Sequence, residues 1–373
     1  MTTKRAATVK KAAPGPNLTA LRGSIDKIDA QLVQLMNERA RVAQEIGKLK
    51  AADGADVFSA GREAAVLTKI VEANPGPLDQ RAVRAIFREL MSGSRALQRA
   101  LRIAFLGPEY SFSHLAAIEQ FGSSVEYVPL ANIAAVFEVV NRGHADLGMV
   151  PIENSTDGRV ADTLDMFLRL PLKICAEVSL RIHQNLLSRS GLGDIQRVYS
   201  KWQALSQCRH WLATNRPQAT LHEVQSTATA VELAKGESHA AAIASRQASV
   251  HYGVAVVQPN IEDRPNNHTR FAVIGHKPAD RTGKDKTCIM FETADEAGAL
   301  HDALGIISKN GVNLTWIESF PAPVDGKTGR YIFFADLAGH LADAPVAAAL
   351  KALEKKCLRA VSLGSFPRGP SFD

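Results

Sequence analysis

Apolar residues in the stretch from residue 18 to 50 recur at seven-residue intervals in two series, and the stretch holds no proline. This spacing predicts one long amphipathic helix. At 1.5 Å per residue the helix would be roughly 48 Å long, too long for short neighbouring helices to cover. We therefore expect a second copy of the chain to cover this apolar seam. The two series are Leu21, Ile28, Leu35, Val42, Leu49 and Ile25, Leu32, Ile46.

Arg39 occupies a seam position where the pattern calls for an apolar residue. An unpaired buried guanidinium is costly, so such a residue is normally matched by an anion. Lys50 follows eleven residues later, about 20° around the helix and on the same face. Arg22 lies one position off the seam near the start of the helix. The predicted helix thus carries cations along a face that is otherwise apolar.

Two further helices are predicted within the next fifty positions, residues 51–100. One opens with "GREAAVL", which contains Arg62 and Glu63, and the other spans residues 79–100. The second continues its apolar stripe with Ser94 and Gln98 at i,i+4 spacing. Cations and amides that interrupt three apolar stripes favour a cationic pocket inside a helical dimer, suited to a small dicarboxylate. The alternative is a set of solvated faces with one internal salt bridge.

Strand-like and helical runs alternate from residue 102 to 275, a pattern typical of α/β domains. Polar residues such as Ser111, Asn154 and Ser155 follow strand-like runs just before helices. Helix N-terminal N–H groups at such positions suit an anionic ligand, although ordinary helix caps use the same residue types.

The stretch "NNHTRFAVIG", residues 266–275, joins donor-rich residues directly to an apolar strand-like run. It sets amides, the hydroxyl of Thr269 and the guanidinium of Arg270 at the mouth of a buried strand. Such a combination indicates a site at a loop end.

The C-terminal ninety residues follow a polar stretch, residues 278–286, that reads as a linker. Their pattern predicts the order βαββαβ, which is ferredoxin-like. The predicted strands are 287–293, 314–320, 330–337 and 360–365, and the predicted helices are 297–310 and 344–355.

Composition narrows the function classes further. The 373 residues, 46% apolar and 22% charged, suit a multidomain globular protein, and no apolar run approaches a membrane span. The first 17 residues hold four of the cations behind the net charge of +6 and no acid, so without them the charge is about +2. This basic tail has no apolar core of a signal peptide, and we expect it to be disordered. We expect no nucleic-acid or membrane partner.

Four cysteines lie far apart, and the histidines show no metal-ligand spacing. Widely separated cysteines indicate a reducing, cytoplasmic compartment. We expect no metal and no organic cofactor.

The first hundred residues resemble a helical chorismate mutase, with matches at "LTALR", "NER", "GKLK", "RE" and "SRALQ". The resemblance implies a one-step pericyclic rearrangement of chorismate to prephenate. Cations would hold the two carboxylates in the reactive conformer, and donors would stabilise charge on the ether oxygen. It implies catalytic roles for Arg39, Lys50, Glu63 and Gln98, and substrate contacts by Arg22 of the partner subunit, Arg62, Ser94 and Ser59, which replaces a family carboxylate.

Residues 102–275 resemble prephenate dehydratase, most specifically at "PIENS" and "TRF". The resemblance implies two α/β lobes of the periplasmic-binding type with the site between them. Prephenate would lose carbon dioxide and its ring hydroxyl to give phenylpyruvate, while Thr269 donates a hydrogen bond to that hydroxyl. It implies substrate contacts by Ser111, Asn154, Ser155, Thr227 and Arg270.

"AGALHDAL" and "TWIESFPAP" resemble the "GAL" and "ESRP" motifs of the phenylalanine-binding ACT domain, with Phe320 in place of the family arginine. The effector residues implied are Gly298, Ala299, Leu300, Glu318 and Ser319. A dimerisation module without an effector is the alternative for this domain.

Together the resemblances imply a homodimeric or homotetrameric bifunctional enzyme of phenylalanine biosynthesis, inhibited by phenylalanine. Arogenate dehydratase activity and a non-catalytic amino-acid or anion sensor are the rival interpretations. The expected domains are a helical mutase domain (18–100), a dehydratase domain (101–279, with lobes 101–180 plus 258–279 and 181–257) and an ACT domain (284–366).

Overall fold

The computed structural model describes residues 17–53, 56–156, 158–321 and 330–369. The chain divides into two compact units, residues 1–55 and 56–373, which are described separately. The expectation of disorder in the basic tail falls on residues outside the described ranges, apart from Asn17. In the described parts of the chain, no helix is long and apolar enough to cross a membrane.

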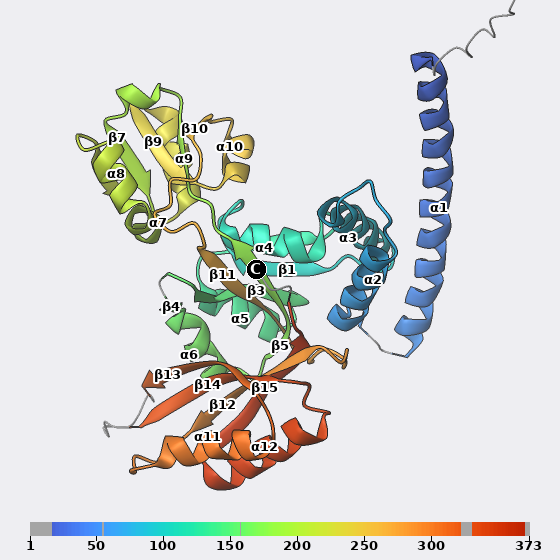
Figure 1. The fold of residues 1–373 in the computed structure, drawn as a ribbon, viewed down its shortest axis with the longest axis vertical. Coiled ribbons are helices and arrows are strands. Elements are labelled where there is room, and N and C mark those ends of the chain that lie inside the picture. Colours follow the sequence, from blue (N-terminus) through green and yellow to red (C-terminus); the bar gives the residue numbers. More distant parts are fainter. Residues whose placement is uncertain (1–16, 54–55, 157, 322–329, 370–373) are drawn as a thin grey trace, which may run out of the picture. The chain divides into compact units, whose positions relative to one another are not determined.

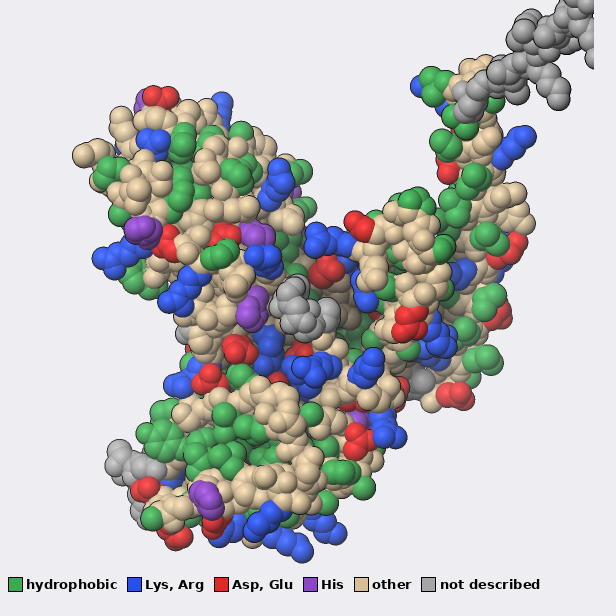
Figure 2. Space-filling model, in the orientation of Figure 1, with side chains coloured by type: hydrophobic (Ala, Val, Ile, Leu, Met, Phe, Trp, Pro, Cys, Tyr) green, Lys and Arg blue, Asp and Glu red, His purple; other side chains and the backbone are tan. Residues whose placement is uncertain are grey.

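The first unit is a single helix, α1 (Leu18–Ala52, Figure 1). Asn17 begins it as N-cap, because its side-chain oxygen accepts a hydrogen bond from the Thr19 N–H at 3.0 Å. The long helix predicted from the heptad spacing is confirmed. Its seam residues have exposed fractions between 44% (Leu32) and 69% (Leu49) in the single chain. Hydrophobic side chains therefore reach the surface along this helix (green in Figure 2).

The second unit begins with two helices, α2 (Ala60–Glu72) and α3 (Gln80–Ala96), which pack against each other. The α3 helix ends four residues before the predicted end at residue 100. Its last turn tightens, because the Gln98 N–H bonds the Arg95 carbonyl three residues back at 2.8 Å. An ion pair of 2.7 Å between Arg88 and Glu119 ties α3 to the following helix, α4 (Phe112–Phe121).

A six-stranded mixed sheet forms the first lobe, with the strand order β2-β1-β3-β11-β5 and β4 paired to β3. One face packs against α4 and the other against α5 and α6. Side chains alternate between the two faces of the sheet along each strand. Both faces are apolar where the helices cover them. The elements are β1 (Arg102–Leu106), β2 (Glu126–Leu130), α5 (Ile133–Asn141), β3 (Leu147–Asn154), β4 (Gly158–Arg159), α6 (Ala161–Arg169), β5 (Lys173–Arg181) and β11 (His268–Gly275).

The second lobe is inserted between β5 and β11 and holds a five-stranded sheet of order β10-β6-β9-β7-β8. Because two chain segments connect the lobes, the ends of β5 and β11 lie side by side at the crossing. Its elements are β6 (Asn185–Ser188), β7 (Arg197–Ser200), α7 (Trp202–Gln207), α8 (Arg209–Asn215), β8 (Thr220–Glu223), α9 (Thr227–Gly236), β9 (Ala240–Ala244), α10 (Arg246–Tyr252) and β10 (Val256–Gln258).

The C-terminal domain is an antiparallel sheet of order β13-β14-β12-β15 with two helices on one face (Figure 1). The predicted βαββαβ order is confirmed, and every predicted boundary lies within two residues of the observed one. The other sheet face shares a core with the first lobe, through side chains such as Phe334 and Ile174. The elements are β12 (Asp285–Glu292), α11 (Ala299–Lys309), β13 (Leu314–Pro321), β14 (Tyr331–Ala338), α12 (Ala344–Lys356) and β15 (Arg359–Pro367).

Candidate functional site

Thr269 and Asn154 face each other on the paired strands β11 and β3. The Asn154 Nδ2 donates a hydrogen bond to the Thr269 Oγ1 at 2.7 Å. Thr269 is 8% exposed, so its hydroxyl lies in a largely dry environment. Since the oxygen already accepts a bond from Asn154, the rotamer of Thr269 is fixed and its hydroxyl hydrogen can be donated to another group.

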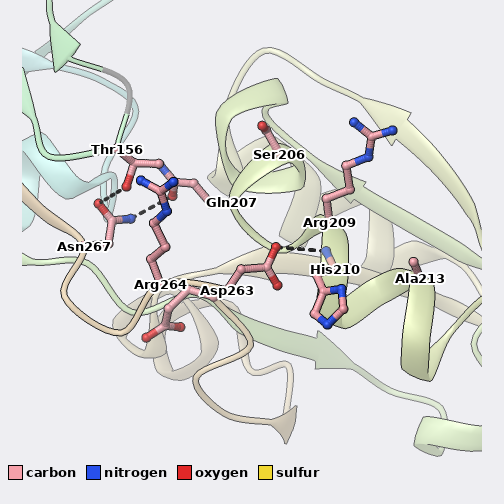
Figure 3. Close-up of a pocket in the computed structure, with 10 residues that line it drawn as sticks. Thr156, Ser206, Gln207, Arg209, His210, Ala213, Asp263, Arg264 and Asn267 are labelled. Atoms are coloured by element: carbon pink, nitrogen blue, oxygen red, sulfur yellow. Dashed lines mark hydrogen bonds between the residues drawn. The ribbon is translucent and has the colours of Figure 1, made fainter.

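Asn267 extends this pair into a polar network at the lobe crossing. Its Oδ1 accepts from Asn154 Nδ2 at 3.2 Å and from the Thr156 hydroxyl at 3.3 Å, and its Nδ2 donates to the Gln207 Oε1 at 2.9 Å (Figure 3). Gln207 belongs to α7 of the second lobe and also accepts from Gln184 Nε2 at 3.1 Å. The network therefore runs from Thr269 across both lobes.

A cavity of about 500 Å³ lies beside this network. Figure 3 shows the Arg264 side chain reaching toward Thr156 and Gln207. The two acids of the wall are engaged in the second lobe: Glu262 accepts from the Gln184 N–H at 2.9 Å, and Asp263 accepts from the first N–H groups of α8. The wall thus combines the guanidiniums of Arg209 and Arg264 with two acids that already accept hydrogen bonds from the backbone. It is lined by Thr156, Ser206, Gln207, Arg209, His210, Ala213, Glu262, Asp263, Arg264 and Asn267.

Three other predicted dehydratase residues lie at the starts of helices or at the end of a strand. Ser111 is the N-cap of α4 and donates to the Leu106 carbonyl at 2.9 Å. Ser155 accepts from the His268 N–H at 3.0 Å and so fixes the loop before β11. Thr227 is the first residue of α9. Asn154 and Thr269, by contrast, are hydrogen-bonded directly to each other.

Arg270 faces away from the cavity. Neighbouring residues on a strand point to opposite faces, and the Arg270 guanidinium contacts carboxylates of Glu153, Glu177 and Asp336. Burial opposes the charged guanidinium, but Asp336, Glu177 and Glu153 outweigh burial and raise the pKa of Arg270. The guanidinium is thus held by three protein carboxylates, and the expected role of Arg270, to orient the loop or to bind a substrate carboxylate, stays a prediction.

The predicted mutase residues fall in both units. Arg22, Arg39 and Lys50 belong to α1, where Arg39 and Lys50 are half-buried and Arg22 is exposed. In the second unit, Ser59 caps α2 by accepting from the Arg62 N–H at 3.3 Å. Arg39 and Lys50, eleven residues apart, lie on one face of α1.

The remaining mutase residues cluster where α2 meets α3. Ser94 donates to the Leu90 carbonyl at 2.7 Å, and the Gln98 Nε2 lies 3.5 Å from the Ser94 carbonyl. Glu63 pairs with Arg95, which is 5% exposed and also donates to the Phe121 carbonyl. Arg95 is a residue that the sequence patterns did not single out, although it lies inside the "SRALQ" match. It holds the Glu63 carboxylate in place.

The predicted effector residues lie at two separate places in the C-terminal domain. Gly298 precedes α11 with φ of 86°, a conformation that favours glycine, and Ala299 and Leu300 begin the helix. On β13, Glu318 points toward the first lobe, 3.7 Å from Arg159, while Ser319 is exposed. The cavity in this domain, about 410 Å³, lies at the other end of α11 and is lined by Leu304, Ile307, Ser308, Gly311, Val312, Asn313 and Leu314.

Within the described residues, no group of three or more histidine, cysteine or acidic side chains could hold a metal ion. The polar groups that line the cavity are hydroxyls, amides, guanidiniums, one imidazole and two carboxylates. The fold and this cavity define a two-lobed α/β protein with a polar cavity at the lobe crossing and a ferredoxin-like accessory domain.

Family models identify three parts of the chain: chorismate mutase type II over residues 21–99, prephenate dehydratase over 103–279 and an ACT domain over 289–355. The bifunctional chorismate mutase/prephenate dehydratase of Aquifex aeolicus is 41% identical over 94% of this chain and 98% of its own length. The chain belongs to the family of bifunctional chorismate mutase/prephenate dehydratases.

Two solved structures are similar to the second unit's fold. Prephenate dehydratase of Arthrobacter aurescens in complex with L-Phe is 33% identical, with a TM-score of 0.66, over 72% of this chain and 90% of that one. GqqA, described as a novel type of quorum quenching acylase, is 30% identical, with a TM-score of 0.64, over 72% of this chain and 98% of that one. Since one fold carries two described activities, function must be argued from the site.

Proposed function

We propose that the chain rearranges chorismate to prephenate with its helical part and converts prephenate to phenylpyruvate in the cavity between the two lobes. The observation that carries the second activity is the buried Thr269 hydroxyl, held by Asn154 beside a cation-lined cavity. Aromatisation of the ring supplies the driving force, so the site needs mainly to assist the leaving hydroxyl and to hold two carboxylates.

The dehydratase step breaks the bond to the carboxyl carbon and the bond to the ring hydroxyl. The electron pair left by carbon dioxide enters the ring as the hydroxyl departs, and the hydroxyl takes up a proton to leave as water. Thr269 donates a hydrogen bond to this hydroxyl, because Asn154 already occupies one of its lone pairs. A threonine is a poor acid, so it assists by hydrogen bonding in a dry cleft. Arg264 and Arg209 face the carboxylates.

The mutase step needs no nucleophile. Arg39 and Lys50, with Arg62 and with Arg22 of a second copy, hold the two carboxylates of chorismate in the reactive conformer. Glu63, Ser94 and Gln98 contact the remaining polar groups, and Arg95 fixes Glu63. Because the donors are positioned before the reaction, they stabilise charge on the ether oxygen at low reorganisation cost.

The exposed seam of α1 makes a second copy of the chain the partner that we propose for it. Leu35→Glu sets a charge on the seam, and Ala30→Glu sets the same charge on the opposite side of the helix. We expect Leu35→Glu to weaken dimerisation by about 100-fold or more, since burying an unpaired carboxylate costs several kcal/mol. Analytical ultracentrifugation measures this effect. An unchanged dimer in Leu35→Glu would contradict the interface, and Ala30→Glu should behave as the native chain.

Phenylalanine is the effector that we propose for the C-terminal domain. Calorimetry on the intact protein should detect its binding, and millimolar phenylalanine should inhibit the dehydratase more than the mutase. Coupling between sites is reciprocal, so prephenate should weaken phenylalanine binding by the same factor. A protein that gives no binding heat and no inhibition would leave this domain as a dimerisation module.

Arogenate is the second substrate to test for the dehydratase cavity. It carries an amino group where prephenate carries a keto group, so acids in the cavity wall would favour it. Glu262 and Asp263 are both engaged within the second lobe. We therefore expect prephenate to give the higher kcat/KM when the two substrates are compared. A cytoplasmic location fits both substrates.

A further inference from the structure

The inner face of β13 contacts two arginines of the first lobe. Residues alternate along this strand, so Trp316, Glu318 and Phe320 are half-buried, while the residues between them are exposed. Arg270 of β11 lies with its guanidinium carbon 5.0 Å from the centre of the Trp316 ring. Arg159 of β4 lies 6.0 Å from the centre of the Phe320 ring and 3.7 Å from the Glu318 carboxylate. One strand of the ACT domain therefore meets both arginines.

Arg270 is the centre of a buried ion cluster that joins the two domains. Its Nη2 lies 2.6 Å from Asp336 of β14, and its Nη1 lies 3.0 Å from Glu153 of β3. Lys286 of β12 adds a second cation, 2.9 Å from Glu177 of β5. The side chain of Asp336 is fully buried and that of Arg270 is 12% exposed. Buried charges of this kind tolerate little displacement, because loss of one partner leaves the others unpaired.

Arg159 lies on the strand next to that of Asn154, and Arg270 lies on the strand of Thr269. Arg159 pairs with Glu153, and Gly158 with Asn154, in the β4–β3 ladder. Arg270 follows Thr269 directly on β11 and lies opposite Glu153 on β3. A shift of β13 would therefore act on β3 and β11 at the residues next to the Asn154–Thr269 hydrogen bond.

We propose that Arg270 and Arg159 are positioning residues that transmit the state of β13 in the ACT domain to the Asn154–Thr269 pair. This proposal rests on the proposed roles of Thr269 and of phenylalanine. Neither arginine touches the substrate; each sets the geometry of the strand that carries a catalytic group. Displacements of about 1 Å at a catalytic group cost roughly 100-fold in rate, so a small movement of β13 suffices for control.

The first test uses Arg159→Gln, with Arg142→Gln as its matched control. Arg159 is 37% exposed, so its replacement leaves the core intact, and Arg142 forms an ordinary i,i+4 pair with Glu138 on α5 of the same lobe. At saturating phenylalanine, Arg159→Gln should retain dehydratase activity at least ~5-fold above that of the native enzyme, the low end of typical allosteric coupling. Calorimetry should still detect phenylalanine binding. Arg142→Gln should be inhibited as the native enzyme is.

The second test uses Arg270→Lys, which keeps the charge but loses the two-pronged contact with Asp336 and Glu153. We expect kcat for prephenate to fall by ~10-fold or more, with KM within about 2-fold and the mutase rate unchanged. A purely structural role would lower the melting temperature without changing kcat per folded site. In a double-mutant cycle, Arg270→Lys and Thr269→Val should give effects on kcat that do not multiply, because the position of Thr269 no longer matters once its hydroxyl is gone.

Full phenylalanine inhibition in Arg159→Gln together with an unchanged kcat in Arg270→Lys would overturn the proposal. If Arg270→Lys does not fold, Arg159→Gln decides alone. Failure of the underlying function is recognised separately. A native enzyme that binds no phenylalanine refutes the effector role, and a Thr269→Val enzyme with native kcat refutes the catalytic role.

Discussion

Thr269→Val should lower the dehydratase kcat by ~100-fold or more, the usual range for removing a positioned donor from a reacting group. Valine keeps the shape and the β-branching of threonine, so strand β11 should keep its pairing with β3. The change removes only the hydroxyl that Asn154 holds at 2.7 Å. Substrate affinity should change less, because the carboxylates are held by other groups. Steady-state kinetics with prephenate measure both parameters.

Two controls separate the missing hydroxyl from disturbed packing. Thr269→Ser keeps the hydroxyl and should retain most of the activity. Thr220→Val makes the same chemical change on the exposed strand β8, where the threonine hydroxyl meets the Gln196 carbonyl at 3.3 Å and the His222 Nε2 at 3.0 Å, and should leave kcat unchanged. A native kcat in Thr269→Val would assign leaving-group assistance to another polar group of the cavity wall.

The sequence was most informative where one regular pattern spans a whole element. Helix α1 follows from its heptad spacing, and the C-terminal βαββαβ order follows from alternating apolar runs, because local periodicity reports which face is covered. The end of α3 was predicted four residues late. No local signal marked the tight turn at Gln98, which forms because the chain must enter β1 at Arg102.

The site residues also fall into those that the sequence predicted and those that only the packing of the lobes brings together. Thr269 and Asn154 were identified one by one from their motifs, and the register of β11 and β3 brings them together. Gln207 was missed because it meets Asn267 only through the packing of the two lobes, 60 residues apart in sequence. Its only signal was its place in the stretch "VYSKWQALSQC", residues 198–208, within the region that resembles prephenate dehydratase. Neighbouring side chains on a strand point to opposite faces. The sequence alone therefore already argued against placing Arg270 in the same pocket as Thr269.

Arg39→Ala should lower the mutase kcat/KM by roughly 30-fold to 5000-fold, because truncating one member of a buried charge pair with the substrate costs about 2–5 kcal/mol. The dehydratase rate on supplied prephenate should persist. Arg39 lies on helix α1 of the first unit, whereas the proposed dehydratase groups lie on strands β3 and β11 of the second unit. Arg41→Ala removes an arginine from an exposed position of the same helix and should leave both rates unchanged. A mutase rate within a few-fold of the native one would refute the pocket.

The proposed dimer provides the decisive control for Arg39. This residue is a cation among apolar seam positions, so alanine makes the seam more apolar and should leave the dimer as tight as before or tighter. Leu35→Glu should instead lose mutase activity and dimer together. An Arg39→Ala protein that is dimeric, active on prephenate and inactive on chorismate therefore assigns the lost activity to the missing guanidinium. If the Arg39→Ala protein is monomeric, the arginine holds the two copies together. The loss of mutase activity would then come from the lost dimer, and the proposed binding of a substrate carboxylate would be refuted as its cause.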